Sequence, residues 1–108
     1  LQHGAKIDYA PQRNTALMMA SQEGHLEIVR SLISSGAHVN VRGRLGWTAL
    51  MFATACGHEA IVRTLLAAGA HTELASTSNG IWGKGWTAKD IAMIFHQPNI
   101  LSIIEKGR

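Results

Sequence analysis

The chain has 108 residues, 46% of them hydrophobic, a formal net charge of +3 and one cysteine, Cys56. This length fits one small domain, and a single cysteine excludes an internal disulfide, so we expect a reducing compartment, the cytoplasm or the nucleus. The ten Lys and Arg residues form no basic run, which disfavours nucleic acid, and no apolar run is long enough to cross a membrane.

The first ten residues resemble the end of a structural unit rather than its beginning. Gly4-Ala5 matches Gly36-Ala37 further along the chain. We therefore interpret residues 1–10 as the tail of a unit whose helices are missing, and we expect the sequence to be a piece of a longer protein.

Two units of the same design follow. Four landmarks recur 33 residues later in the chain: Thr15 at Thr48, Gly24 at Gly57, His25 at His58, and Gly36 at Gly69. Threonine is a good helix N-cap, and glycine supplies the left-handed turn that ends a helix. The spacing predicts helices at about 15–23 and 26–34, and again at 48–56 and 58–67. The alternating polar and apolar residues 38–41 between them predict a short hairpin arm.

A third unit departs from this period. Thr87 falls 39 residues after Thr48, so six extra residues lie in the Gly-, Ser- and Asn-rich segment 74–85. His96-Gln97 replaces the Gly-His turn, and Pro98 is expected to begin the last helix. Lys89 stands where the earlier units have Leu17 and Leu50, and Glu105 stands where the second unit has Leu66, which indicates a capping unit at the end of a stack.

The period of 33 and the T-x-L…A…G-H…I-V…G-A pattern resemble the ankyrin repeat. The resemblance covers nearly the whole chain, although the usual Thr-Pro-Leu-His start is altered in both full units. It implies an all-α solenoid of stacked helix-turn-helix units with projecting hairpin loops. We expect repeats at 11–42 and 43–75, and a divergent C-terminal capping repeat at 76–108 that is preceded by a six-residue loop insertion.

Residues that could carry chemistry have simpler interpretations. The six histidines form no H-x-x-x-H or HExxH pair, and one cysteine cannot build a cysteine-rich zinc site. The resemblance implies that His25 and His58 bond backbone groups and tie one unit to the next. Cys56 has no orienting third group beside His58, so we interpret it as a simple thiol.

The glycines of the insertion do not form a phosphate loop, because Gly85 is followed by Trp86 rather than by Lys-Ser or Lys-Thr. We interpret these glycines as loop flexibility. We therefore predict no enzyme activity, no metal and no cofactor.

The resemblance implies a non-enzymatic protein–protein interaction module that uses its concave face and finger loops. Trp and Arg are enriched at interface hot spots, although the tryptophans could serve only to stiffen the stack. We expect a protein or peptide partner that is acidic or offers an apolar anchor. The predicted contact residues are Asn14, Gln22, Glu23, Arg42, Arg44, Leu45, Trp47, Ala55, Cys56, Ile81, Trp82, Lys84 and Trp86.

Two other functions stay open at this point. The chain could be the targeting arm of a multidomain enzyme or signalling scaffold, or it could bind nucleic acid through Arg42, Arg44 and Lys84, with a steep salt dependence. Asn40 also resembles the asparagines that an asparaginyl hydroxylase modifies in ankyrin repeats, so it is a predicted modification site.

Overall fold

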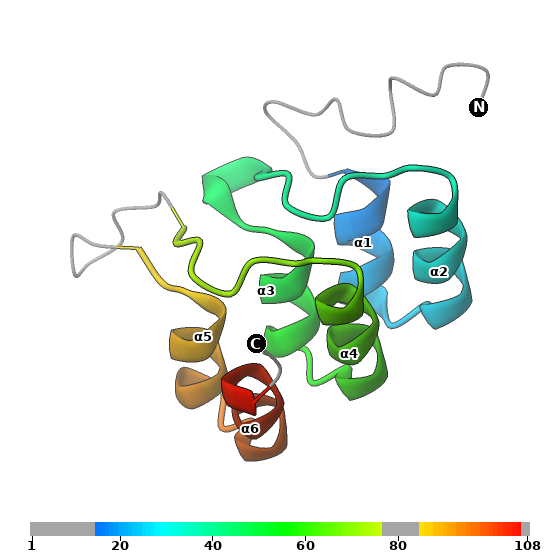
Figure 1. Cartoon of the computed structure of the whole chain (residues 1–108). Coiled ribbons are helices and arrows are strands. Elements are labelled where there is room, and N and C mark those ends of the chain that lie inside the picture. Colours follow the sequence, from blue (N-terminus) through cyan, green and yellow to red (C-terminus); the bar gives the residue numbers. More distant parts are fainter. Residues whose placement is uncertain (1–14, 77–84, 107–108) are drawn as a thin grey trace.

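The computed structural model describes residues 15–76 and 85–106, and these form three pairs of helices (Figure 1). The pairs are α1 (Ala16–Glu23) with α2 (Leu26–Ser34), α3 (Ala49–Ala55) with α4 (Glu59–Ala67), and α5 (Ala88–Ile94) with α6 (Pro98–Lys106). A short 3₁₀ helix, η2 (Arg44–Gly46), precedes α3. The all-α prediction is confirmed, and the four helices predicted in the first two units begin and end within one residue of the observed ones.

The helices form two layers. Helix α3 contacts both α1 and α5, which gives a first-helix layer, and α4 contacts both α2 and α6, which gives a second-helix layer. Figure 1 shows that the short turns within each pair lie at one end of the stack, while the longer loops between pairs lie at the other end. The first helices therefore separate a turn end from a loop end.

The three threonines begin the first helix of each pair, as predicted. The hydroxyls of Thr15, Thr48 and Thr87 accept hydrogen bonds from the backbone N–H three residues later, at 3.2, 3.3 and 3.2 Å. At Thr87 the bond is reciprocated, because its own N–H donates to Asp90 Oδ2 at 3.0 Å. This full capping box satisfies two otherwise unpaired N–H groups at the start of α5.

The core lies between the two layers and between adjacent pairs. Leu17, Leu50, Val62 and Ile100 are at most 2% exposed. In the third pair, Lys89 takes the position of Leu50, and its Nζ lies 3.4 Å from Oε2 of Glu105, with both side chains about half exposed. Two apolar positions of the inner units are thus replaced by one ion pair on the last unit.

The loop after α2 does not contain the predicted hairpin strands. Residues 35–48 contain turns and the 3₁₀ helix but no strand, and a bond from Gly43 N–H to the Trp47 carbonyl at 2.9 Å closes the loop. Val39 is buried in the core and Val41 packs against it, so the alternation of residues 38–41 reflects core contacts rather than a strand ladder.

The loop after α4 is closed at the equivalent position. Ser76 N–H donates to the Trp86 carbonyl at 2.9 Å, and Trp86 N–H donates to Ser76 Oγ at 3.0 Å. A Cβ on Gly85 would overlap the Ser76 carbonyl oxygen. The interpretation of Gly85 as loop flexibility is therefore wrong, because this glycine permits a close approach of two backbone segments.

Candidate functional site

Of the thirteen predicted contact residues, the structure describes eight in full, and these eight form two groups. Asn14, Ile81, Trp82 and Lys84 lie outside the described residues, as does the side chain of Arg44. Arg42, Leu45, Trp47 and Trp86 lie at the loop end of the first-helix layer, and we call them the finger group. Gln22, Glu23, Ala55 and Cys56 lie at its turn end. A first helix of seven or eight residues separates the groups, which corresponds to roughly 11 Å.

The finger group contains an aromatic pair and an exposed leucine. The ring of Trp47 lies 4.9 Å from that of Phe52, centroid to centroid, at an interplanar angle of 47°. Trp47 is half-buried by this contact, which anchors the loop to its own first helix. Leu45 is 58% exposed and has a φ of 61°, a left-handed conformation that side chains with a Cβ rarely adopt.

The two other members of the finger group make structural hydrogen bonds. Nη2 of Arg42 donates to the Ala75 carbonyl at 3.0 Å, so its guanidinium joins two successive loops. The backbone of Trp86 closes the second loop on Ser76. Contact of either side chain with a partner stays a prediction.

The turn end carries a row of side chains in equivalent positions, all exposed except Ala55, which is half-buried. Gln22 and Glu23 end the first helix of the first pair, and Ala55 and Cys56 take the same positions in the second, 33 residues later. In the third pair these positions hold Ile94 and Phe95, 39 residues after Ala55 and Cys56. We call these six residues the turn-end row: Gln22, Glu23, Ala55, Cys56, Ile94 and Phe95.

Ile94 and Phe95 were not among the predicted contact residues. They are 47% and 43% exposed, and both are large hydrophobic side chains. The signal that identifies them was present in the sequence: once His96-Gln97 aligns with Gly57-His58, the two preceding residues align with Ala55 and Cys56. The local sequence does not show whether a large apolar residue near a helix end is buried. The exposure of Ile94 and Phe95 can be inferred only from their alignment with Ala55 and Cys56.

The turns behind the row position it. Gly24 and Gly57 have φ of 82° and 76°, and His96 holds the same left-handed turn at 56° without being glycine. Nε2 of His58 donates to the Gln22 carbonyl at 3.1 Å, which confirms that this histidine ties its unit to the preceding one. His25 differs, because its Nε2 lies 3.4 Å from Oε1 of Glu23 in the same unit.

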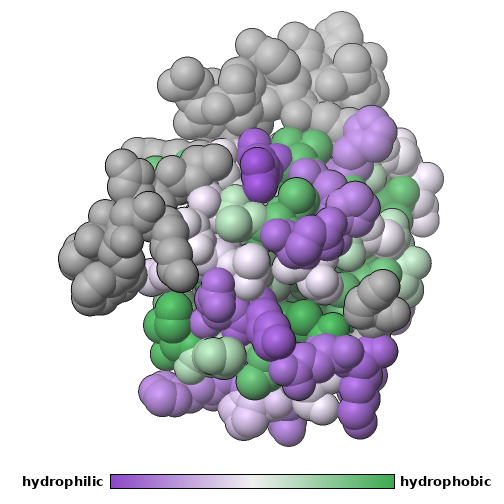
Figure 2. All heavy atoms as spheres, turned by 60° about the vertical axis from the view of Figure 1, so that its left-hand side comes forward, coloured by the Kyte–Doolittle hydropathy of each residue, from purple (hydrophilic) through white to green (hydrophobic). Residues whose placement is uncertain are grey.

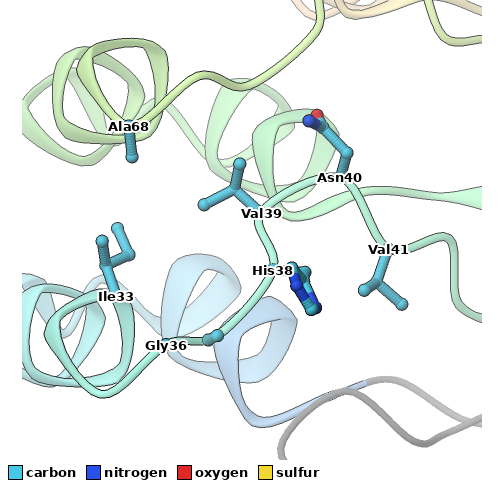
Figure 3. A pocket seen from close by; sticks show the side chains of 8 residues that line it. Ile33, Gly36, His38, Val39, Asn40, Val41 and Ala68 are labelled. Atoms are coloured by element: carbon cyan, nitrogen blue, oxygen red, sulfur yellow. The ribbon is translucent and has the colours of Figure 1, made fainter.

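A pocket of about 630 Å³ lies away from the row, between the C-terminal ends of α2 and α4 (Figure 3). Ile33, Val39 and Ala68 point into it. Asn40 lines its edge, where Nδ2 donates to the Gly69 carbonyl at 3.1 Å and Oδ1 accepts from His71 N–H at 2.7 Å. The Asn40 amide thus joins two successive loops, and its hydroxylation stays a prediction.

The charged groups of the described residues do not gather into one patch. A second, open pocket of about 360 Å³ between α4 and α6 is lined by Arg63 and Lys106 and also by the acidic Glu59. On the face shown in Figure 2, hydrophobic side chains occur in small groups separated by hydrophilic ones. Within residues 15–76 and 85–106, no three His, Cys, Asp or Glu side chains could hold a metal ion, and no helix is long and apolar enough to span a bilayer.

Comparison with known proteins adds one finding. A family model described as ankyrin repeats (3 copies) matches residues 1–76 and 17–107. No curated protein matches the chain.

Proposed function

Because this chain belongs to the ankyrin-repeat family, whose repeats generally serve as protein–protein interaction modules, we propose that it binds a partner protein through the exposed side of its first-helix layer. The observation that carries this proposal is the pair Ile94 and Phe95, which stays about half exposed at the end of the turn-end row. Exposed aromatic and aliphatic side chains on a rigid frame can bind with little loss of conformational entropy.

The finger group supplies the second half of the proposed surface. Leu45 projects an apolar side chain from a left-handed position, which strains the backbone by roughly 1–3 kcal/mol. A strained, exposed leucine favours a role outside the fold, because an asparagine or glycine there would satisfy the turn at lower cost.

Quantitative capture from a cell extract tests the proposal. The native chain is compared with the Ile94→Ser/Phe95→Ser variant and with a matched control, Ile28→Ser, whose residue is 50% exposed on α2 in the second-helix layer. We expect the row variant to lose captured proteins by about tenfold while the control keeps them. Equal recovery by all three forms would remove the turn-end row from the binding surface.

A further inference from the structure

The turn-end row changes its chemistry in order along the stack. Its first pair of residues is polar and acidic, with 63% of the Glu23 side chain exposed. Its second pair, Ala55 and Cys56, is small. Its third pair, Ile94 and Phe95, is large and hydrophobic. Because the three pairs occupy equivalent positions on adjacent helices, these properties follow one another from α1 to α3 to α5.

We propose that the partner segment is an extended peptide that places a basic side chain on Glu23 and a large apolar side chain on Ile94 and Phe95, with its backbone lying close over Ala55 and Cys56. This inference rests on the proposed function and adds the chemistry and polarity of the partner.

The acidic end is suited to a cation. Glu23 contacts His25 through Oε1 at 3.4 Å, yet most of its side chain is still exposed to solvent. A Lys or Arg at this position would form a charge-assisted hydrogen bond with the carboxylate. The middle of the row sets the approach, because side chains as small as alanine and cysteine leave the partner backbone room to lie near the helix ends.

The distance between the two ends sets the spacing within the partner. Neighbouring packed helices lie roughly 8–10 Å apart, so two steps from α1 to α5 span about 16–20 Å. An extended chain covers about 3.3 Å per residue, which places the basic and apolar side chains about five to six residues apart. The expected segment is therefore short and carries one charge and one large apolar residue.

Selection from a random phage-displayed library of 12-residue peptides tests this inference. The native chain, Glu23→Lys, Phe95→Ser and the control Ile28→Ser are each used for selection, and the enriched peptides are then synthesised and titrated by fluorescence anisotropy. We expect peptides for the native chain to pair Lys or Arg with a large apolar residue at this spacing. Glu23→Lys should shift the enriched charge to Asp or Glu, while the apolar residue is kept.

Affinity separates the two proposals. Peptides selected on the native chain should lose about tenfold in affinity for Phe95→Ser and none for Ile28→Ser. Peptides that depend on Phe95 but keep the same charge on Glu23→Lys would overturn the ordered chemistry and leave the proposed function standing. No enrichment at all, or peptides indifferent to both row variants, would overturn both.

Discussion

Gly24 and Gly36 both adopt left-handed backbone, with φ of +82° and +101°, but only Gly24 faces another side chain. A Cβ on Gly24 would lie 2.8 Å from Cε1 of His58, whereas nothing lies within 4 Å of a Cβ on Gly36. A substitution at either glycine therefore strains the backbone, but only a substitution at Gly24 also produces a steric clash. The difference between the two substitutions therefore measures the contact between the Gly24 turn and His58 of the next unit.

We expect Gly36→Ala to lower the free energy of unfolding by about 1 kcal/mol through backbone strain. Gly24→Ala should cost roughly 1–3 kcal/mol more, since the His58 ring must shift and strain its hydrogen bond to Gln22. Urea denaturation measures both values. In a His58→Ala background the difference should shrink, and equal costs in the native background would show that the ring moves aside freely.

The loops after α2 and α4 show how a loop of this stack accepts an insertion. Gly43 and Trp47 close three intervening residues, and Ser76 and Trp86 close nine, with the same 2.9 Å bond from N–H to carbonyl. The extra residues lie between two hydrogen-bonded residues that occupy equivalent positions in both loops. The helices on either side of the insertion therefore keep the same arrangement as those around the shorter loop. The insertion is therefore an addition to the loop, and the stack does not depend on it.

Replacing residues 77–85 by Arg-Leu-Gly, the sequence of η2, tests this view. We expect the free energy of unfolding to stay the same or to rise by up to about 1 kcal/mol, because closing a threefold shorter loop costs less entropy. Gly85→Ala in the full-length loop should instead destabilise, because its Cβ would overlap the Ser76 carbonyl. Thermal unfolding of the two variants gives the comparison, and a large loss of stability in the shortened form would contradict it.

Local signals account for what the sequence predicted correctly. Thr15, Thr48 and Thr87 cap helices through bonds to residues three positions away, so spacing alone locates them. The missed features depend on distant residues. The close approach of Gly85 to Ser76 spans an insertion, and the Asn40 amide bonds to residues about 30 positions away, in the next loop. Exposure of Ile94 and Phe95 is likewise decided by neighbouring helices, which no local pattern encodes.

At the scale of the whole molecule, the third pair ends the described stack with Lys89 and Glu105 where Leu50 and Leu66 stand in the second pair. Beside them Met93 is 53% exposed at the position of Thr54, which is buried. The ion pair of Lys89 with Glu105 lies among exposed apolar residues and keeps the surface of the third pair hydrated.

Replacing Lys89 and Glu105 by leucine should therefore create an apolar surface that binds a second copy of the chain. We expect Lys89→Leu/Glu105→Leu to self-associate, because each added leucine contributes about 1.5 kcal/mol or more when covered by a second molecule. Sedimentation velocity at several micromolar concentrations would show a coefficient that rises with concentration. The charge-swapped control, Lys89→Glu/Glu105→Lys, should sediment like the native chain, and so should the double leucine variant if the ion pair has no such role.

The Asn40 amide has a further consequence under mechanical tension. It clasps the loop after α4 through Gly69 and His71, whereas its counterpart Glu73 contacts His71 within its own loop. A force that separates the first two pairs of helices at the loop end must therefore break both hydrogen bonds of this amide.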